Sequence, residues 1–230
     1  MTPFDTPGWN RFRYSLYAPI YDLWVGRVPV FTRGRRRAHE LAALRPGETV
    51  LLVAAGTGLD LPLLPPGARV IAGDIAPGMV RRLRARAESL GLDARVEEMD
   101  AARLPLPDAS VDCVLLHLAL AVVPDPVATI REAARVLRPG GRVSVFDKFL
   151  PDDRRPSLLR RLVDVVANVI ATRVNRQLGP LARVAGLRVV HREPTGLGVL
   201  FVAARLEPGA APSTLTAVAG TASDPEGRAR

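Results

Sequence analysis

Between residues 32 and about 150, short apolar runs alternate with segments of helical periodicity. The first run, at 49–53, is continuously apolar and ends in a glycine turn, as expected of a strand buried on both faces of a parallel sheet. Further strands are predicted at 69–73, 94–98, 111–117 and 142–147, and helices at 77–90 and from an N-cap at Asp125 to Leu137. Strands that alternate with helices indicate an α/β fold with a mostly parallel sheet.

The C-terminal part adds a different pattern. A basic, apolar helix is expected near 156–178, followed by strand-like runs at 187–192 and 199–204. The glycine-containing link at 195–198 suits a hairpin, so we predict an antiparallel pair at the edge of the sheet.

The chain divides into three parts. Residues 1–31 form a segment that holds eight of the eleven aromatic residues, residues 32–206 form one α/β domain, and residues 207–230 lack periodicity and are expected to be a disordered tail. With 230 residues, the chain is long enough for one well-buried domain.

The composition of the chain bears on its partner and on its cellular location. The net charge of +9 suggests an anionic partner. Lys148 is the only lysine, however, so nearly all of the positive charge comes from arginine, and a codon usage that favours arginine explains the charge equally well. Cys113, the single cysteine, lies in an apolar run and is expected to be buried. We see no signal-peptide pattern and no uninterrupted apolar stretch of about 18 residues, so we expect a cytoplasmic protein.

The strongest local signal is the turn that follows the first strand. It reads Ala54, Ala55, Gly56, Thr57, Gly58, and its glycines allow a ligand to approach the backbone closely. Asp74 ends the second strand, where a carboxylate can accept both ribose hydroxyls of a nucleoside. Asp100, after the third strand, can accept from an adenine amino group while the Ala101 amide faces a ring nitrogen. Each residue alone also has an ordinary structural explanation.

Four motifs in order resemble the class I S-adenosylmethionine (SAM)-dependent methyltransferases. They are the glycine turn, the segment 73–80, the segment 100–112 and the stretch 135–143 before the fifth strand. The resemblance covers roughly residues 32–206. It implies SAM as cofactor, a Rossmann-like methyltransferase sheet of seven mostly parallel strands with the last strand antiparallel, and helices on both faces. It also places Ile75 and Met79 beside the cofactor.

The glycine motif departs from the family pattern at two positions. Leu52 stands where the family usually has an acidic residue that helps hold the methionine amino group, and Ala54 stands where it has glycine. Loss of the acid is expected to weaken SAM binding by roughly 1–3 kcal/mol, with Asp60 as a partial substitute. A dinucleotide dehydrogenase is the neighbouring alternative, but it calls for glycine at position 61, where Leu61 stands.

His117 ends the fourth strand, which faces the transferred methyl group in this fold. We consider two roles equally: a catalytic residue that acts as general base or orients the acceptor, and a packed histidine. The residues from His117 to Leu120 differ from the acidic-Pro-Pro-aromatic motif of enzymes that methylate base amines in DNA. We therefore do not expect a nucleic-acid partner, and we expect no metal ligands.

The aromatic N-terminal segment is interleaved with arginines, and Arg33, Arg35, Arg36 and Arg37 follow it. We favour a lid over the active site, while peripheral contact with the inner membrane face stays open. Loose matches at 21–27, 31–37 and 172–176 are similar to bacterial phosphatidylethanolamine and ubiquinone/menaquinone-type methyltransferases. They imply a small-molecule or lipid-like acceptor that is methylated on an amine, a ring carbon or an oxygen. The alternatives are a non-catalytic scaffold with a degraded cofactor motif and an RNA methyltransferase.

Overall fold

The computed structural model describes residues 26–153, 175–196 and 201–209, together with Gly8, Arg11, Tyr14 and Asp22. The helix expected near 156–178, the hairpin link and the C-terminal tail therefore lie largely outside the described residues. Among the described residues, no helix has the length and apolarity needed to cross a bilayer.

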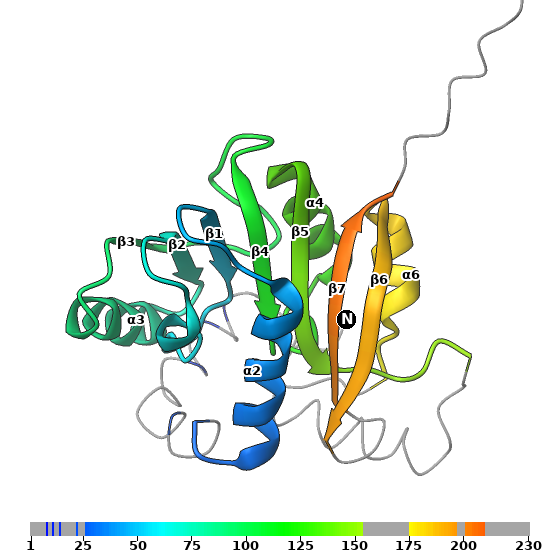
Figure 1. Cartoon of the computed structure of the whole chain (residues 1–230), viewed down its shortest axis with the longest axis horizontal. Helices are drawn as coiled ribbons and strands as arrows, with labels where there is room; N and C mark the ends of the chain where they lie inside the picture. The colour runs from blue at the N-terminus through cyan, green and yellow to red at the C-terminus, as the bar shows by residue number, and fades with distance from the viewer. Residues whose placement is uncertain are drawn as a thin grey trace, which may run out of the picture.

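The core of the molecule is one seven-stranded sheet with the order β3-β2-β1-β4-β5-β7-β6 (Figure 1). The strands are β1 (Thr49–Val53), β2 (Arg69–Asp74), β3 (Ala94–Glu98), β4 (Val111–His117), β5 (Leu137–Lys148), β6 (Leu187–Gly196) and β7 (Phe201–Pro208). All pairs are parallel except those of β7, which runs antiparallel to both β5 and β6. The predicted sheet with its antiparallel last strand is confirmed.

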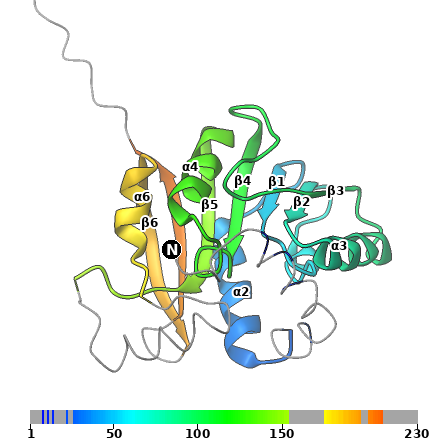
Figure 2. The same ribbon diagram turned by 180° about the vertical axis from the view of Figure 1, so that it is seen from behind.

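The helices cover both faces of the sheet, as predicted. Helices α2 (Pro29–Ala42) and α3 (Pro77–Ser89) pack on one face, and α4 (Pro126–Val136) and α6 (Leu178–Val184) pack on the other (Figures 1 and 2). α2 runs across the boundary expected between residues 31 and 32, so the basic cluster of that region belongs to a helix against the sheet.

Sequence signals at the helix ends act largely as predicted. Asp125 caps α4 by accepting a hydrogen bond of 2.9 Å from the Ala128 amide. The glycines after this helix do not form a separate turn, because β5 already begins at Leu137, five residues before the predicted start. The additional residues at the start of β5 are accommodated by an irregular register in its pairing with β4.

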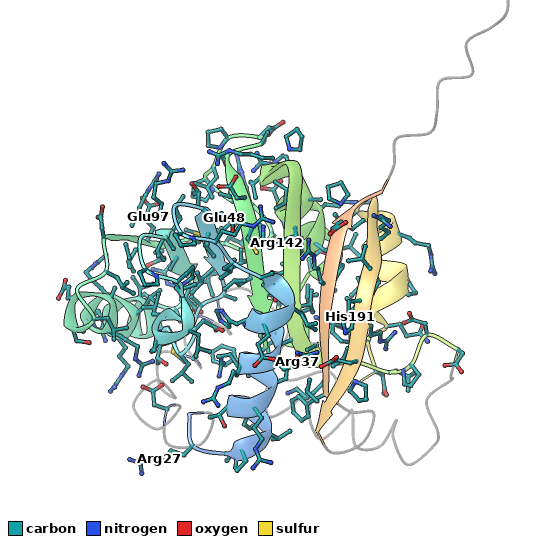
Figure 3. All side chains as sticks on the ribbon, viewed as in Figure 1. Arg27, Arg37, Glu48, Glu97, Arg142 and His191 are labelled. Atoms are coloured by element: carbon teal, nitrogen blue, oxygen red, sulfur yellow. The ribbon has the colours of Figure 1, made fainter. Side chains whose placement is uncertain are left out.

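The C-terminal end of α2 is fixed to the sheet by one buried arginine. Arg142 on β5 donates to the Ala42 carbonyl oxygen and, over 2.9 Å, to that of Ala43, the residue that ends the helix. It also makes a two-pronged ion pair of 3.0 and 2.7 Å with Glu48, whose pKa this pairing lowers (Figure 3). A cation at a helix C-terminus also interacts favourably with the helix dipole.

Replacing this arginine is expected to be costly. Arg142→Ala would leave two helix-end carbonyl groups and the Glu48 carboxylate without their donor, so we expect it to lower the free energy of unfolding by about 3 kcal/mol. Urea-induced unfolding followed by circular dichroism measures this. The exposed Arg188, paired with Glu207 at 3.2 Å, provides the control, and Arg188→Ala should change stability by less than about 0.5 kcal/mol. Equal losses in the two variants would contradict the role of Arg142.

Candidate functional site

The glycine turn lies at the carboxyl end of β1, the edge of the sheet at which ligands bind in open α/β folds. Its backbone turns sharply: Ala54, Gly56 and Gly58 have φ angles of 51°, 57° and 81°. At Gly58 a Cβ would lie 2.7 Å from Leu83 and 2.9 Å from Leu61, so only glycine fits there. Ala54 adopts the left-handed conformation although it carries a Cβ, which costs about 1 kcal/mol.

Asp74 is buried at the end of β2, and both of its carboxylate oxygens face backbone amides. Oδ2 accepts from Gly56 and Oδ1 from Ala76, each at 2.9 Å. Burial raises the pKa of Asp74, and these backbone hydrogen bonds oppose that rise. Asp74 thus joins the glycine turn to the start of α3. A carboxylate oxygen accepts more than one hydrogen bond, so the group keeps acceptor capacity.

The other expected cofactor residues gather at the same edge of the sheet. Met79 is buried against Ala76, and Tyr14 from the N-terminal segment packs on both. Asp100 is exposed and accepts from the Ala102 amide at 2.9 Å, whereas Ala101 is buried. The two remaining residues, Ile75 and Ala55, are partly exposed in the connections after β2 and β1.

Leu52, at the position of the missing acid, is part of the apolar core. It is 2% exposed and belongs to the cluster that includes Leu61, Leu83 and Leu115. A carboxylate at this position would have no polar partner within that cluster. The departure from the family pattern is therefore built into the packing of this face of the sheet.

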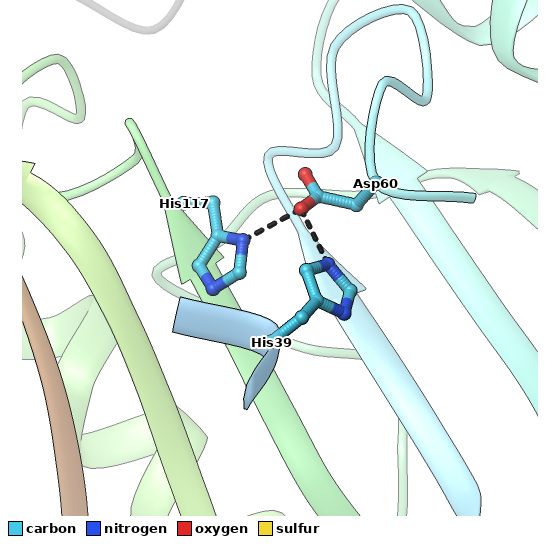
Figure 4. A group of neighbouring side chains, drawn as sticks. All are labelled: His39, Asp60 and His117. Atoms are coloured by element: carbon cyan, nitrogen blue, oxygen red, sulfur yellow. Dashed lines mark hydrogen bonds and ion pairs between the residues drawn. The ribbon is translucent and has the colours of Figure 1, made fainter. Parts of the chain in front are cut away.

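Asp60 forms a buried cluster with three donors, shown in part in Figure 4. Its Oδ1 lies 2.6 Å from Nδ1 of His117 and 2.8 Å from Nε2 of His39, and its Oδ2 lies 3.1 Å from Nε of Arg35. We call these four residues the Asp60 cluster. Burial alone would raise the pKa of Asp60, but Arg35 and the histidines outweigh it, so the pKa lies well below its ordinary value.

His117 therefore has both ring nitrogens engaged. Nδ1 faces Asp60, and Nε2 lies 3.0 Å from Oγ of Ser144. A neutral His117 that donates from Nδ1 accepts the single Ser144 hydroxyl proton at Nε2, and Oγ also lies 3.0 Å from the Ala38 carbonyl oxygen. Burial lowers the pKa of His117, and the nearby Asp60 charge only partly opposes this. Of the two roles considered for His117, this geometry favours that of a packed, hydrogen-bonded histidine. His39 takes part in the same cluster, whereas His191 is exposed beside Glu193.

An acidic and a basic residue end β5 at the same edge. Asp147 is fully buried and accepts from the Ala121 amide at 2.7 Å. Burial raises the pKa of Asp147 and lowers that of Lys148, and the attraction between the two side chains opposes both shifts. The Lys148 ammonium lies 5.8 Å from the centre of the Phe201 ring, within the range of a cation–π interaction.

Described residues of the N-terminal segment contact the edge of the sheet that carries the glycine turn. Asp22 accepts from the Thr57 hydroxyl of the glycine turn and pairs with Arg86 of α3 at 2.5 Å. Arg86 also donates to the Thr57 carbonyl oxygen at 2.7 Å. Farther along, Arg11 pairs with Glu98 at 2.5 Å. Asp22 lies in the loosely matched segment 21–27, but no role was predicted for it there, and Arg86 lies in no motif. Their contacts join residues far apart in the chain, so no local pattern indicates them.

Comparison with known proteins agrees with this geometry. The profile described as "Methyltransferase domain" matches residues 51–145. Phosphatidylethanolamine N-methyltransferase of Cereibacter sphaeroides is 32% identical over 190 residues, which span 82% of this chain and 92% of that protein. The chain belongs to the SAM-dependent methyltransferase family. Demethylmenaquinone methyltransferase of Thermus thermophilus is 40% identical over 141 residues, 58% of this chain and 63% of that protein.

Solved structures show the same fold at low identity. The [4+2]-cyclase SpnF has a TM-score of 0.73 at 18% identity, over 89% of this chain and 96% of that one. A SAM-dependent methyltransferase from Aquifex aeolicus has a TM-score of 0.59 at 20% identity, over 87% of this chain and 97% of that one. The methyltransferase thus uses SAM on a Rossmann-like sheet, as the sequence predicted.

The strain at Ala54 can be tested by a single substitution. Ala54→Gly removes the cost of a left-handed conformation at a residue with a Cβ, about 1–2 kcal/mol. It also lowers the free energy of unfolding by about 0.4–1 kcal/mol, because glycine increases the conformational entropy of the unfolded chain. We expect a net stabilisation of roughly 0.5–1 kcal/mol, measured by urea unfolding. Ala55→Gly is the matched control, because Ala55 has no positive φ and the change should destabilise. A loss of stability in both variants would contradict the strain.

The buried histidine predicts a pH dependence of stability. Because the folded-state pKa of His117 is lowered, the unfolded chain binds a proton first as pH falls below about 6.5. Stability should therefore decline on acidification from pH 7 toward 5, with a slope of up to about 1.4 kcal/mol per pH unit from this one group. His117→Gln should flatten the slope. An unaltered slope in His117→Gln would refute the assignment.

Proposed function

We propose that this methyltransferase transfers the SAM methyl group to a lipid-like amine of the phosphatidylethanolamine type. The observation that carries the proposal is the match to the phosphatidylethanolamine N-methyltransferase of Cereibacter sphaeroides, which extends over 92% of that protein. A quinone-type ring carbon is the second candidate. It is favoured by the shorter match to a demethylmenaquinone methyltransferase.

The cofactor is proposed to lie across the carboxyl ends of β1, β2 and β3. The turn from Ala54 to Gly58 would approach the methionine part, and the free acceptor capacity of Asp74 suits the ribose hydroxyls. Met79 and Ile75 would flank the adenine, with Asp100 and the Ala101 amide at its polar edge. The proposed arrangement is supported by the position of all these residues at the same edge of the sheet.

The reaction needs alignment more than acid–base chemistry. An amine nitrogen lone pair attacks the methyl carbon, the bond from carbon to sulfur breaks, and the sulfonium becomes a neutral thioether. The nitrogen releases a proton to solvent. Positioning the nitrogen behind the methyl group and excluding water account for the rate enhancement. His117 supports the floor of this site through the Asp60 cluster, and Asp147 and Lys148 are proposed to line the acceptor side.

The N-terminal segment is proposed to act as a lid. The proposal is supported by the packing of Tyr14 against the Ala76–Met79 cluster and by the hydrogen bond between Asp22 and Thr57, both beside the proposed cofactor position. Closure would exclude water from the sulfonium. Its aromatic and arginine residues also suit contact with an anionic membrane surface that presents a lipid acceptor.

Two experiments test the proposal. In the first, calorimetry measures SAM binding to wild type and to Asp74→Asn, which should bind at least tenfold more weakly because hydrogen bonds to a charged acceptor are lost. Asp108→Asn is the control, since Asp108 is exposed and pairs only with Arg135 among the described contacts. Absence of SAM binding by wild type would favour the scaffold alternative.

The second experiment identifies the acceptor. Purified protein is incubated with methyl-labelled SAM and either vesicles that contain phosphatidylethanolamine or a demethylmenaquinol in detergent. We expect label in the lipid amine fraction. Label only in the quinol would favour the second candidate. Label in added RNA, with neither small acceptor methylated, would contradict both candidates.

A further inference from the structure

The connection that follows the glycine turn lacks a full helix. Residues 54–68 join β1 to β2, and their only regular element is a 3₁₀-helix of three residues, Leu61–Leu63. A long helix in this place would stabilise the turn through its own hydrogen bonds and its packing. Here that support has to come from side chains.

Asp60 is placed to supply it. Asp60 is the N-cap residue of the short 3₁₀-helix, yet its side chain makes no capping hydrogen bond. Instead the carboxylate is 5% exposed and turns inward to Arg35, His39 and His117. One carboxylate thus ties the segment after Gly58 to α2 and to β4.

The polar contacts of the Asp60 cluster continue into the sheet. His117 reaches Ser144 of β5 at 3.0 Å, and Ser144 reaches the Ala38 carbonyl oxygen of α2 at 3.0 Å. This series of polar contacts therefore ends on the helix from which it started. Because Asp60 lies only two residues after Gly58, a displaced carboxylate would shift the backbone that meets the cofactor.

We propose that Asp60 is a positioning residue for the SAM-binding turn, which it holds in place of the absent helix through Arg35, His39 and His117. This inference rests on the proposal that the glycine turn holds SAM. It assigns Asp60 no contact with SAM, because the carboxylate is 5% exposed and turns inward to its three donors. It thus differs from the expectation that Asp60 replaces the acid missing at Leu52.

The same residues raise the question of a metal ion. The ligand atoms of His39, Asp60 and His117 lie within 4.8 Å of one another, and two histidines with a carboxylate form a common metal-binding set. Two features favour hydrogen bonds instead. The nitrogen–oxygen distances of 2.6 and 2.8 Å are shorter than the roughly 3.3 Å between ligands of tetrahedral zinc. Arg35 also already neutralises the carboxylate at 3.1 Å.

The test compares two aspartates, each paired with an arginine. Asp60→Asn is set against Asp112→Asn, because Asp112 also pairs with an arginine, Arg138 at 2.8 Å, and accepts from the Thr49 amide at the start of β1. SAM affinity is measured by calorimetry at a temperature at which circular dichroism shows each variant folded. We expect Asp60→Asn to weaken SAM binding at least tenfold and Asp112→Asn to change it less than threefold.

A double variant separates positioning from direct contact. In Arg35→Gln/Asp60→Asn, both charges are removed and hydrogen bonds between the side chains can re-form, so SAM affinity should return to within about threefold of wild type. A carboxylate that touched SAM directly would not be rescued in this way. Failure of the rescue would therefore overturn the positioning role.

The remaining outcomes are also decisive. Unchanged SAM affinity in Asp60→Asn, with binding lost in Asp74→Asn, would overturn this inference and leave the proposed cofactor site intact. Unchanged affinity in both variants would overturn the cofactor site itself. If Zn²⁺ or Fe²⁺ raised the melting temperature of wild type but not of Asp60→Asn, the cluster would be a metal site and the positioning role would be overturned.

Discussion

The buried Asp60 carboxylate is the interaction on which this edge of the molecule depends. It joins α2, the segment after the glycine turn and the end of β4. A buried carboxylate is costly unless it is paired and hydrogen-bonded. Three donors meet that cost, and they fix the separation of the elements that carry them.

The polar groups around the cofactor edge form a second layer of constraint. Asp74 holds the Gly56 amide, and Arg86 with Asp22 holds Thr57. Asp74, Asp22 and Arg86 thus contact the turn directly, and Asp60 anchors the segment that follows it. A turn held in this way can keep its shape even though Ala54 replaces a glycine and Leu52 replaces an acid, which suggests why the family fold persists despite an altered motif.

Much of the fold was predictable because its signals are local. The strands predicted at 49–53, 94–98 and 111–117 match β1, β3 and β4 residue for residue. The start of β5 was missed because the Pro139–Gly140 pair was interpreted only as a helix stop. Helix α6 was also missed, because its seven residues carry too little periodicity to stand out. The candidate cofactor residues could be predicted because they lie at strand ends. The role of His117 could not, because its position at a strand end fits both a catalytic and a packed histidine.

The sequence by itself determined the α/β class, the order of the strands along the chain and the place of the glycine turn, because hydrophobic periodicity and glycine positions act over short distances. Only the tertiary structure decided which polar groups meet. Arg35, His39 and His117 lie 25, 21 and 57 residues from Asp60, and no local pattern encodes such pairs. They come together because the fold packs α2 beside the end of β4, where the ring centres of His39 and His117 lie 5.3 Å apart, so tertiary packing decided which groups meet.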